Sequence, residues 1–135
     1  MTGVNALKLV ALDDEDLAVV SAHLQDAVLK VGDITWLPRQ KRFALVANRF
    51  CWEKDVPART RSALRIECVT RARRKDWPAQ RDAVLELLAI RRDDDGMTLD
   101  FAGGPSVRLE TECVDLLLED LAGPWGARVT PRHEA

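Results

Sequence analysis

Apolar and polar residues alternate with a period of two along most of this chain, but a segment near the N-terminus has helical spacing. ALKLVAL at 6–12 predicts a short strand, and DDEDLAVVSAHLQDAV at 13–28 predicts a helix. Asp13 is a good N-cap and the acidic residues after it suit a helix N-terminus, so we interpret them as a cap rather than as a paired-carboxylate site. The expected core-facing stripe of this helix is Leu17, Val20, Leu24 and Val28.

From residue 27 onward the period is two. VLKVGDITWLP and RFALVANRF predict two strands joined by a hairpin near Pro38 to Lys41, with a bulge or bend at Gly32 and Asp33. ALRIECVTR predicts a strand at 63–71 that presents Leu64, Ile66 and Cys68 on one face and Arg65, Glu67 and Arg71 on the other. AVLELLAIRR, MTLDFA and SVRLET predict three more strands, and DDDG between the first two is typical of a tight hairpin turn.

The C-terminal part of the chain again suggests a helix. Thr111 can cap residues 112–122, and Gly123 can follow as the C′ residue. The apolar stripe of this expected helix is Val114, Leu117, Leu118 and Leu121. Residues 124–135 are punctuated by Pro and Gly, so we expect a loosely ordered tail.

This order of elements predicts an α+β fold. A meander of antiparallel strands must hide one face and its edges. We therefore expect a bent antiparallel sheet or split barrel closed by the C-terminal helix, as in pleckstrin-homology-like domains, with one N-terminal helix. The alternative is a flat sheet with two helices on one face.

The composition indicates a folded protein of one domain spanning 1–135. The 135 residues are 47% hydrophobic and 31% charged, and no apolar run reaches the length of a membrane span. The N-terminus lacks an export signal, which predicts a cytoplasmic location. Three cysteines separated by 17 and 45 residues match neither a disulfide framework nor a zinc site, so we expect Cys68 to be a small buried apolar residue.

One window of the chain is strongly basic. From Lys54 to Arg81, nine basic and three acidic residues give a local charge of +6, which leaves −8 for the rest. A positive strip beside an aromatic residue can bind a phosphate, a carboxylate or an acidic protein surface. The candidate binding residues are Arg65, Arg71, Arg73, Arg74, Lys75 and Trp77. The alternative is a solvated face whose charges pair with the acidic remainder.

Candidate catalytic chemistry is sparse. The chain carries no nucleophile motif, phosphate-binding loop or metal-ligand pattern, so we expect neither a cofactor nor a metal and lean against an enzyme. The net charge of −2 and the lack of a recognisable motif also argue against nucleic-acid binding.

At VGDITWLPRQKRFALVANRFCWE the chain resembles a known family, the alphaproteobacterial domain-of-unknown-function family 2948. Its members carry a similar Leu-Pro turn followed by residues like RFALVANRF and Trp-Glu. The resemblance extends to RSALRIECVTRAR and LETECVDLLLEDLA. It implies no activity, cofactor or catalytic residue, and genes of the family often lie near that of histidinol dehydrogenase.

These observations lead to two functional hypotheses. The first is a cytoplasmic binding or adaptor module that recognises an anionic ligand or an acidic protein surface through the basic strip. The second is an accessory enzyme, or a regulator of a neighbouring metabolic enzyme, that binds a small anionic metabolite. A deep pocket with converging polar groups would favour the second hypothesis, and a flat or convex surface the first.

Overall fold

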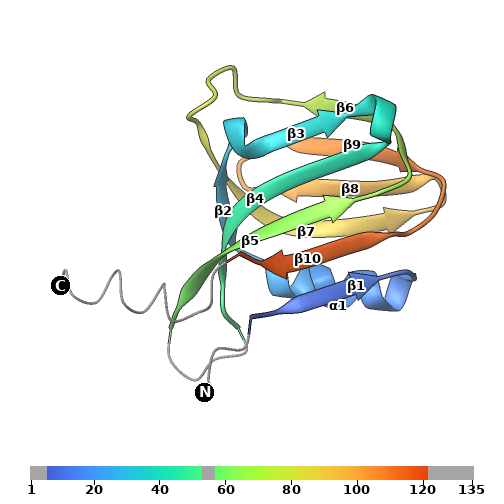
Figure 1. Cartoon of the computed structure of the whole chain (residues 1–135). Helices are drawn as coiled ribbons and strands as arrows, with labels where there is room; N and C mark the ends of the chain where they lie inside the picture. Colours follow the sequence, from blue (N-terminus) through green and yellow to red (C-terminus); the bar gives the residue numbers. More distant parts are fainter. Residues whose placement is uncertain (1–5, 53–56, 122–135) are drawn as a thin grey trace.

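The computed structural model describes residues 6–52 and 57–121, which form one helix and a single antiparallel sheet folded into two facing layers (Figure 1). The elements in chain order are β1 (Lys8–Ala11), α1 (Asp14–Leu24), β2 (Ala27–Lys30), the 3₁₀ turn η1 (Val31–Asp33), β3 (Ile34–Leu37), the 3₁₀ turn η2 (Pro38–Gln40), β4 (Arg42–Phe50), β5 (Arg59–Ile66), β6 (Val69–Lys75), β7 (Val84–Asp93), β8 (Gly96–Phe101), β9 (Ser106–Thr111) and β10 (Leu116–Asp120).

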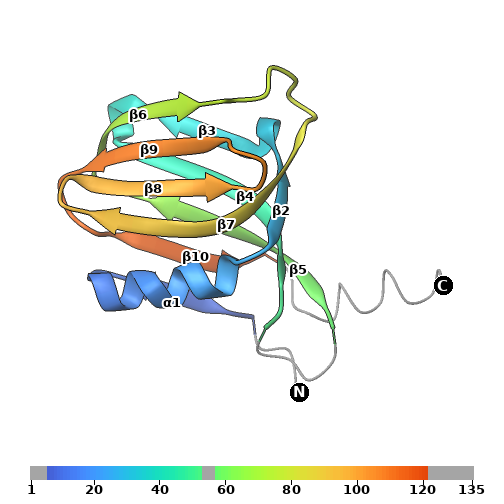
Figure 2. The ribbon, with the colours of Figure 1, turned by 180° about the vertical axis from the view of Figure 1, so that it is seen from behind.

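The two layers are joined by a strand that crosses between them. One layer has the order β3-β4-β5-β10-β1 and the other has the order β7-β8-β9-β6 (Figures 1 and 2). β4 pairs with β3 through Arg42–Leu45 and meets β2 only at Asn48, so the two partners diverge from the same edge of β4. β2 then pairs with β7 and links the layers.

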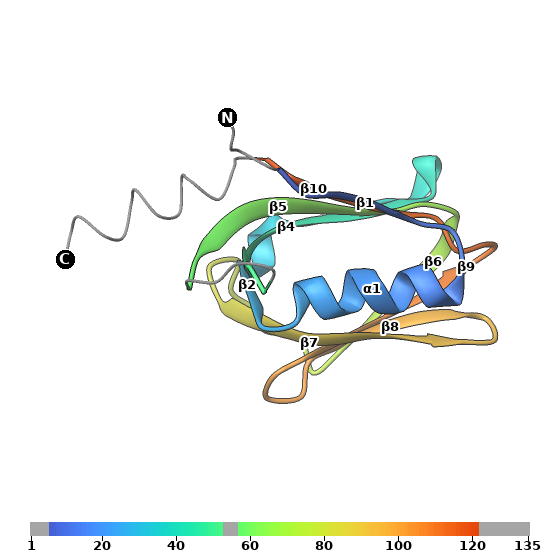
Figure 3. The same ribbon diagram turned by 90° about the horizontal axis from the view of Figure 1, so that it is seen from below.

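The N-terminal strand and helix are confirmed, and the helix closes one side of the sandwich. Asp13 is the N-cap, because its carboxylate accepts a hydrogen bond of 2.7 Å from the backbone N–H of Asp16. α1 lies between β1 and β7 and buries Leu17, Val20 and Leu24 (Figure 3). The helix ends at Leu24, so the expected fourth member of the stripe, Val28, belongs to β2 instead.

The predicted C-terminal helix is wrong, and with it the pleckstrin-homology-like α+β fold. Residues 116–120 form β10, which pairs antiparallel with both β5 and β1. Leu116, Leu118 and Asp120 are buried, while Leu117 and Glu119 between them are half-buried on the outer face. The segment has good helix propensity, but tertiary contacts override it. As a strand between β5 and β1 it has a hydrogen-bonded partner along each of its edges. The alternative fold with two helices on one face is wrong for the same reason.

The predicted strand 63–71 is also wrong as one element. Cys68 has a left-handed backbone, with φ of 62°, and this turn separates β5 in one layer from β6 in the other. Cys68 is half-buried and forms a disulfide with Cys113, 45 residues away, instead of lying in the core unpaired. The disulfide therefore ties the β5–β6 turn to the connection between β9 and β10.

Two predicted hairpins are confirmed. Pro38–Gln40 forms η2 between β3 and β4, and Lys41 follows it with a left-handed backbone, φ 53°. The DDDG segment joins β7 to β8, with Asp93 paired to Gly96. A Cβ at Gly96 would stand 1.9 Å from the carbonyl oxygen of Leu109, so only glycine fits where the turn passes β9.

The described residues share one apolar core between the layers, which includes Phe43, Leu64, Leu87 and Leu109. An ion pair is buried in the same interior, formed by Arg49 of β4 and Asp120 of β10. No helix in the part of the chain that the structure describes is long and apolar enough to cross a membrane. The tail expected at 124–135 lies outside the described residues.

Candidate functional site

The residues of β6 point alternately into and out of the sandwich. β6 pairs with β9, and Ala72 lies opposite Leu109 while Arg74 lies opposite Val107. Directly opposed residues of an antiparallel pair share one face of the sheet. Leu109 and Val107 are buried, so Ala72 and Arg74 belong to the inner face. Arg71, Arg73 and Lys75 consequently belong to the outer face.

A pocket of about 360 Å³ is lined by residues of β3 and β6, among others. These two strands lie on the side of the sandwich opposite α1 (Figure 1). β3 pairs with β4, and β6 pairs with β9, so within the described sheet each of the two strands has one edge without a partner strand. The pocket occupies the space where these two edges meet. It is lined by Val31, Ile34, Trp36, Phe43, Ala72, Arg74, Trp77, Arg81 and Val107.

Aromatic rings from three different elements form much of the pocket wall. Trp36 lies opposite Phe43 in the β3–β4 ladder, so both side chains face inward. Trp77 follows β6 and packs edge-to-face against Phe101, with ring centroids 5.7 Å apart. Trp36 and Trp77 are both half-buried. Trp77 therefore has an apolar contact that fixes it at the rim of the core.

Two arginines belong to the pocket lining, and the described lining residues include no carboxylate. Arg74 is exposed, and its side chain makes no hydrogen bond or ion pair with any other described residue. Arg81 belongs to the β6–β7 connection, where its backbone carbonyl accepts a hydrogen bond of 2.8 Å from the N–H of Gly32. A bond of 3.0 Å from the N–H of Val31 to the carbonyl of Ala83 also holds this connection against η1. The pocket is thus apolar in its walls and positive in its polar groups.

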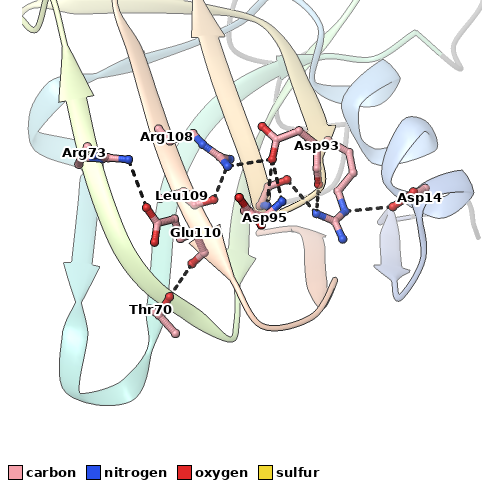
Figure 4. Close-up of polar contacts among 10 residues, drawn as sticks. Asp14, Thr70, Arg73, Asp93, Asp95, Arg108, Leu109 and Glu110 are labelled. Atoms are coloured by element: carbon pink, nitrogen blue, oxygen red, sulfur yellow. Dashed lines mark hydrogen bonds and ion pairs between the residues drawn. The ribbon is translucent and has the colours of Figure 1, made fainter.

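The outer face of β6 and β9 belongs to a network of ion pairs (Figure 4). Arg73 contacts Glu110 at 3.2 Å, and Arg108 contacts Asp93 at 2.8 Å. The network continues to α1, since Arg92 contacts Asp14 at 3.1 Å. On the adjoining strands, the guanidinium of Arg91 pairs with Asp100, and this carboxylate raises the pKa of Arg91.

The β7–β8 turn holds Asp93, a carboxylate of that network that accepts hydrogen bonds from two backbone N–H groups and from Arg108. Desolvation raises the pKa of Asp93. Hydrogen bonds from the N–H groups of Asp95 and Gly96, each 3.1 Å, and the charge of Arg108 lower it by more. The pKa of Asp93 therefore lies below its ordinary value, and the carboxylate stays charged under mildly acid conditions.

The six residues predicted as a binding strip do not share one face. Arg65 lies on β5 in the other layer, where its Nε contacts Glu67 at 2.9 Å. Arg71, Arg73 and Lys75 lie on the outer face of β6, and Arg73 is paired there with Glu110. Only Arg74 and Trp77 line the pocket.

The sequence reasoning missed several residues of the pocket. Trp36 and Phe43 carry a readable signal, because they flank a predicted hairpin at positions that face each other. The alternation of β6 could also have separated Arg74 from Arg73. Nothing in the local pattern marks Arg81, which is brought to the pocket by the fold of the β6–β7 connection.

Other hollows of the surface have a different character. One of about 170 Å³ lies on the outer face of β3, β4, β5 and β10, with Arg65 and Glu119 at its margin. Another of about 310 Å³ lies where β2 and β4 diverge and includes Lys30 and Arg61. Neither has an aromatic residue among its described lining residues. No group of three or more potential metal ligands occurs among the residues that the structure describes.

The molecule is thus a two-layer antiparallel β-protein with one helix and a positively charged aromatic pocket between two strand edges. The chain belongs to the family described as protein of unknown function DUF2948, whose model matches residues 7–133. A comparison with curated proteins finds no match, and neither does a comparison with solved structures.

Proposed function

We propose that this protein is a binding module that takes a small anionic ligand into the pocket between β3 and β6. The observation that carries the proposal is the inward position of Arg74 on β6, opposite the buried Val107. Among the described lining residues, no carboxylate is present to pair with this arginine. A ligand with a carboxylate or phosphate group would supply that partner.

The pocket supports this proposal better than the outer basic face does. Arg65 and Arg73 are engaged by carboxylates of the chain itself, so binding an external anion there would have to displace Glu67 or Glu110. Arg71 and Lys75 can still attract an anion toward this side of the molecule.

The chemistry of the lining supports binding without catalysis. The described side chains of the lining are aliphatic, aromatic or guanidinium, and none of these is a nucleophile or a general base at neutral pH. The second hypothesis, an accessory enzyme or a regulator of a neighbouring metabolic enzyme, uses the same pocket, because either also has to bind its metabolite. The distinguishing property of a regulator would be a partner enzyme whose activity changes with the ligand.

The proposal is tested with 1-anilinonaphthalene-8-sulfonate (ANS), a fluorescent anion with an apolar body. We expect one molecule of ANS to bind per chain, and Arg74→Ala to weaken its affinity at least about tenfold, since a hydrogen bond to a charged group contributes about 1.5–3 kcal/mol. Arg71→Ala is the matched control, because it removes the same charge from the outer face of the same strand. Equal loss in both variants, or no saturable binding by folded protein, would overturn the proposal.

We also propose that the protein acts in the cytoplasm, where thiols are kept reduced and a disulfide is transient. The pair Cys68–Cys113 makes this testable. Cells would be lysed in denaturant with excess N-ethylmaleimide, and the mass of the protein measured. Three modified cysteines are expected, whereas an intact Cys68–Cys113 bond with only Cys51 modified would point to an oxidising compartment.

A further inference from the structure

We infer that the ligand of the β3–β6 pocket is a compact aromatic carboxylate, with a planar ring system and a single negative charge. This inference rests on the proposed function and narrows it to one chemical class. It depends on the shape of the walls, on the number and type of polar groups, and on the size of the pocket.

The walls favour a planar ring over a flexible chain. Trp36, Phe43 and Trp77 come from β3, β4 and the segment after β6, so aromatic surface faces the pocket from both strand edges. Aromatic rings gain additional attraction from edge-to-face or offset stacking. A rigid ring also loses less conformational entropy on binding than an acyl chain with many rotatable bonds.

The polar groups favour a single planar anion. Apart from the indole N–H groups of the tryptophans, the polar side-chain groups among the described lining residues are the guanidinium groups of Arg74 and Arg81. A guanidinium donates hydrogen bonds and accepts none, and that of Arg81 donates one of 3.4 Å to the carbonyl of Gly32. Their planar forks match a carboxylate, which can accept two parallel hydrogen bonds. A sugar or nucleotide would bring hydroxyl and amide groups against aliphatic and aromatic side chains, where those groups would lose their hydrogen bonds to water without replacement.

The size favours a ligand of one or two rings. At about 360 Å³ the pocket lies near the lower end of the roughly 300–1,000 Å³ that is usual for small-molecule sites. The connection from β6 to β7 is hydrogen-bonded to Val31 and Gly32, so it limits the pocket at that end. A longer ligand would have to extend out of the pocket into water.

The inference is tested by isothermal titration calorimetry with four probes. These are 2-naphthoate, its neutral isostere 2-naphthamide, decanoate, and inorganic phosphate. We expect wild-type protein to bind 2-naphthoate at least about tenfold more tightly than each of the other three. In Arg74→Gln, the affinities for 2-naphthoate and 2-naphthamide should differ by no more than about threefold, because the contact of a charged group with its hydrogen-bond partner is lost. The same comparison of 2-naphthoate with 2-naphthamide in Arg81→Gln tests the preference for the acid independently at the second guanidinium.

The possible failures can be told apart. If decanoate binds as tightly as 2-naphthoate, or 2-naphthamide binds as tightly as the acid, the ligand class is wrong. Binding of ANS that depends on Arg74 would then leave the proposed function in place. If substitution of Arg74 changes the affinity for neither ANS nor 2-naphthoate, in variants whose melting temperature is unchanged, both the ligand class and the proposed function are wrong.

Discussion

Arg49 of β4 and Asp120 of β10 form a bidentate ion pair in the interior of the sandwich. The guanidinium donates from Nε to Oδ1 at 2.9 Å and from Nη2 to Oδ2 at 3.0 Å, and both side chains have no exposed surface. Asp120 also accepts hydrogen bonds from the hydroxyl of Ser62, at 2.6 Å, and from the N–H of Leu7, at 2.8 Å. The pair therefore connects β4, β5, β10 and the residue before β1.

Removing one partner of this pair should be costly. Asp120→Ala leaves a buried guanidinium without its carboxylate, and we expect the free energy of unfolding to fall by about 3–5 kcal/mol. Glu119→Ala is the control, since its side chain is only half-buried on the outer face of the same strand and should change stability by about 0.5 kcal/mol or less. Chemical denaturation measures both values, and similar losses in the two variants would contradict the buried network.

The strand geometry of β10 predicts an alternation in the cost of truncating its leucines. Leu118 is fully buried in the core, and Leu118→Ala should cost about 2–5 kcal/mol. Leu117 is half-buried between Val10 and Arg65 on the outer face, so Leu117→Ala should cost clearly less. On a helix these adjacent leucines would both belong to the apolar stripe, and comparable losses at the two positions would favour that arrangement.

The disulfide should contribute to stability because it closes a loop of 45 residues. Replacing Cys68 and Cys113 together with Ser should lower the free energy of unfolding by about 2–4 kcal/mol relative to the oxidised protein. Dithiothreitol should have a similar effect on the wild type and none on the double variant. A double variant as stable as the oxidised wild type would show that the bond does not constrain the chain.

The lowered pKa of Asp93 predicts a pH dependence of the outer network. A carboxyl group with a lowered pKa in the folded state stabilises the protein above its pKa in the unfolded chain. That contribution is lost as the pH falls through the lower, folded value. Arg108→Gln should move the pKa of Asp93 upward, because it removes an attractive charge 2.8 Å away. A carbon-detected NMR titration of the carboxyl group measures the shift, and Arg39→Gln, in η2, is the control.

The sequence pattern predicted local structure well wherever the local signal and the tertiary structure agreed. The Asp13 cap, the Pro38–Lys41 turn and the Asp93–Gly96 turn all depend on nearby backbone groups, and all three are present. Alternation likewise located β4, β8 and β9, and the apolar run before the Asp-Gly turn located β7. These features can be predicted from residues that are close together in the sequence.

The errors occurred where distant contacts decided the structure. Residues 116–120 have the composition of a helix, but they occupy the position between β5 and β1, where Asp120 meets Arg49. The alternation through Ile66 and Cys68 hid a turn that the Cys68–Cys113 disulfide fixes from 45 residues away. The basic window was visible in the sequence, but its division between an ion-pair network and a pocket depends on the two faces of β6.

The central claim is that an anionic ligand binds between β3 and β6, and the indole N–H signals of the tryptophans test it most directly. Trp36 and Trp77 line the pocket, whereas Trp52 donates its indole N–H to the carbonyl of Gln25 elsewhere, at 3.1 Å. In a ¹H–¹⁵N NMR titration with ANS, we expect the Trp36 and Trp77 signals to shift together and saturably, and that of Trp52 to stay in place. Shifts confined to Trp52, or a Trp36 signal that does not respond, would contradict a site between these strands.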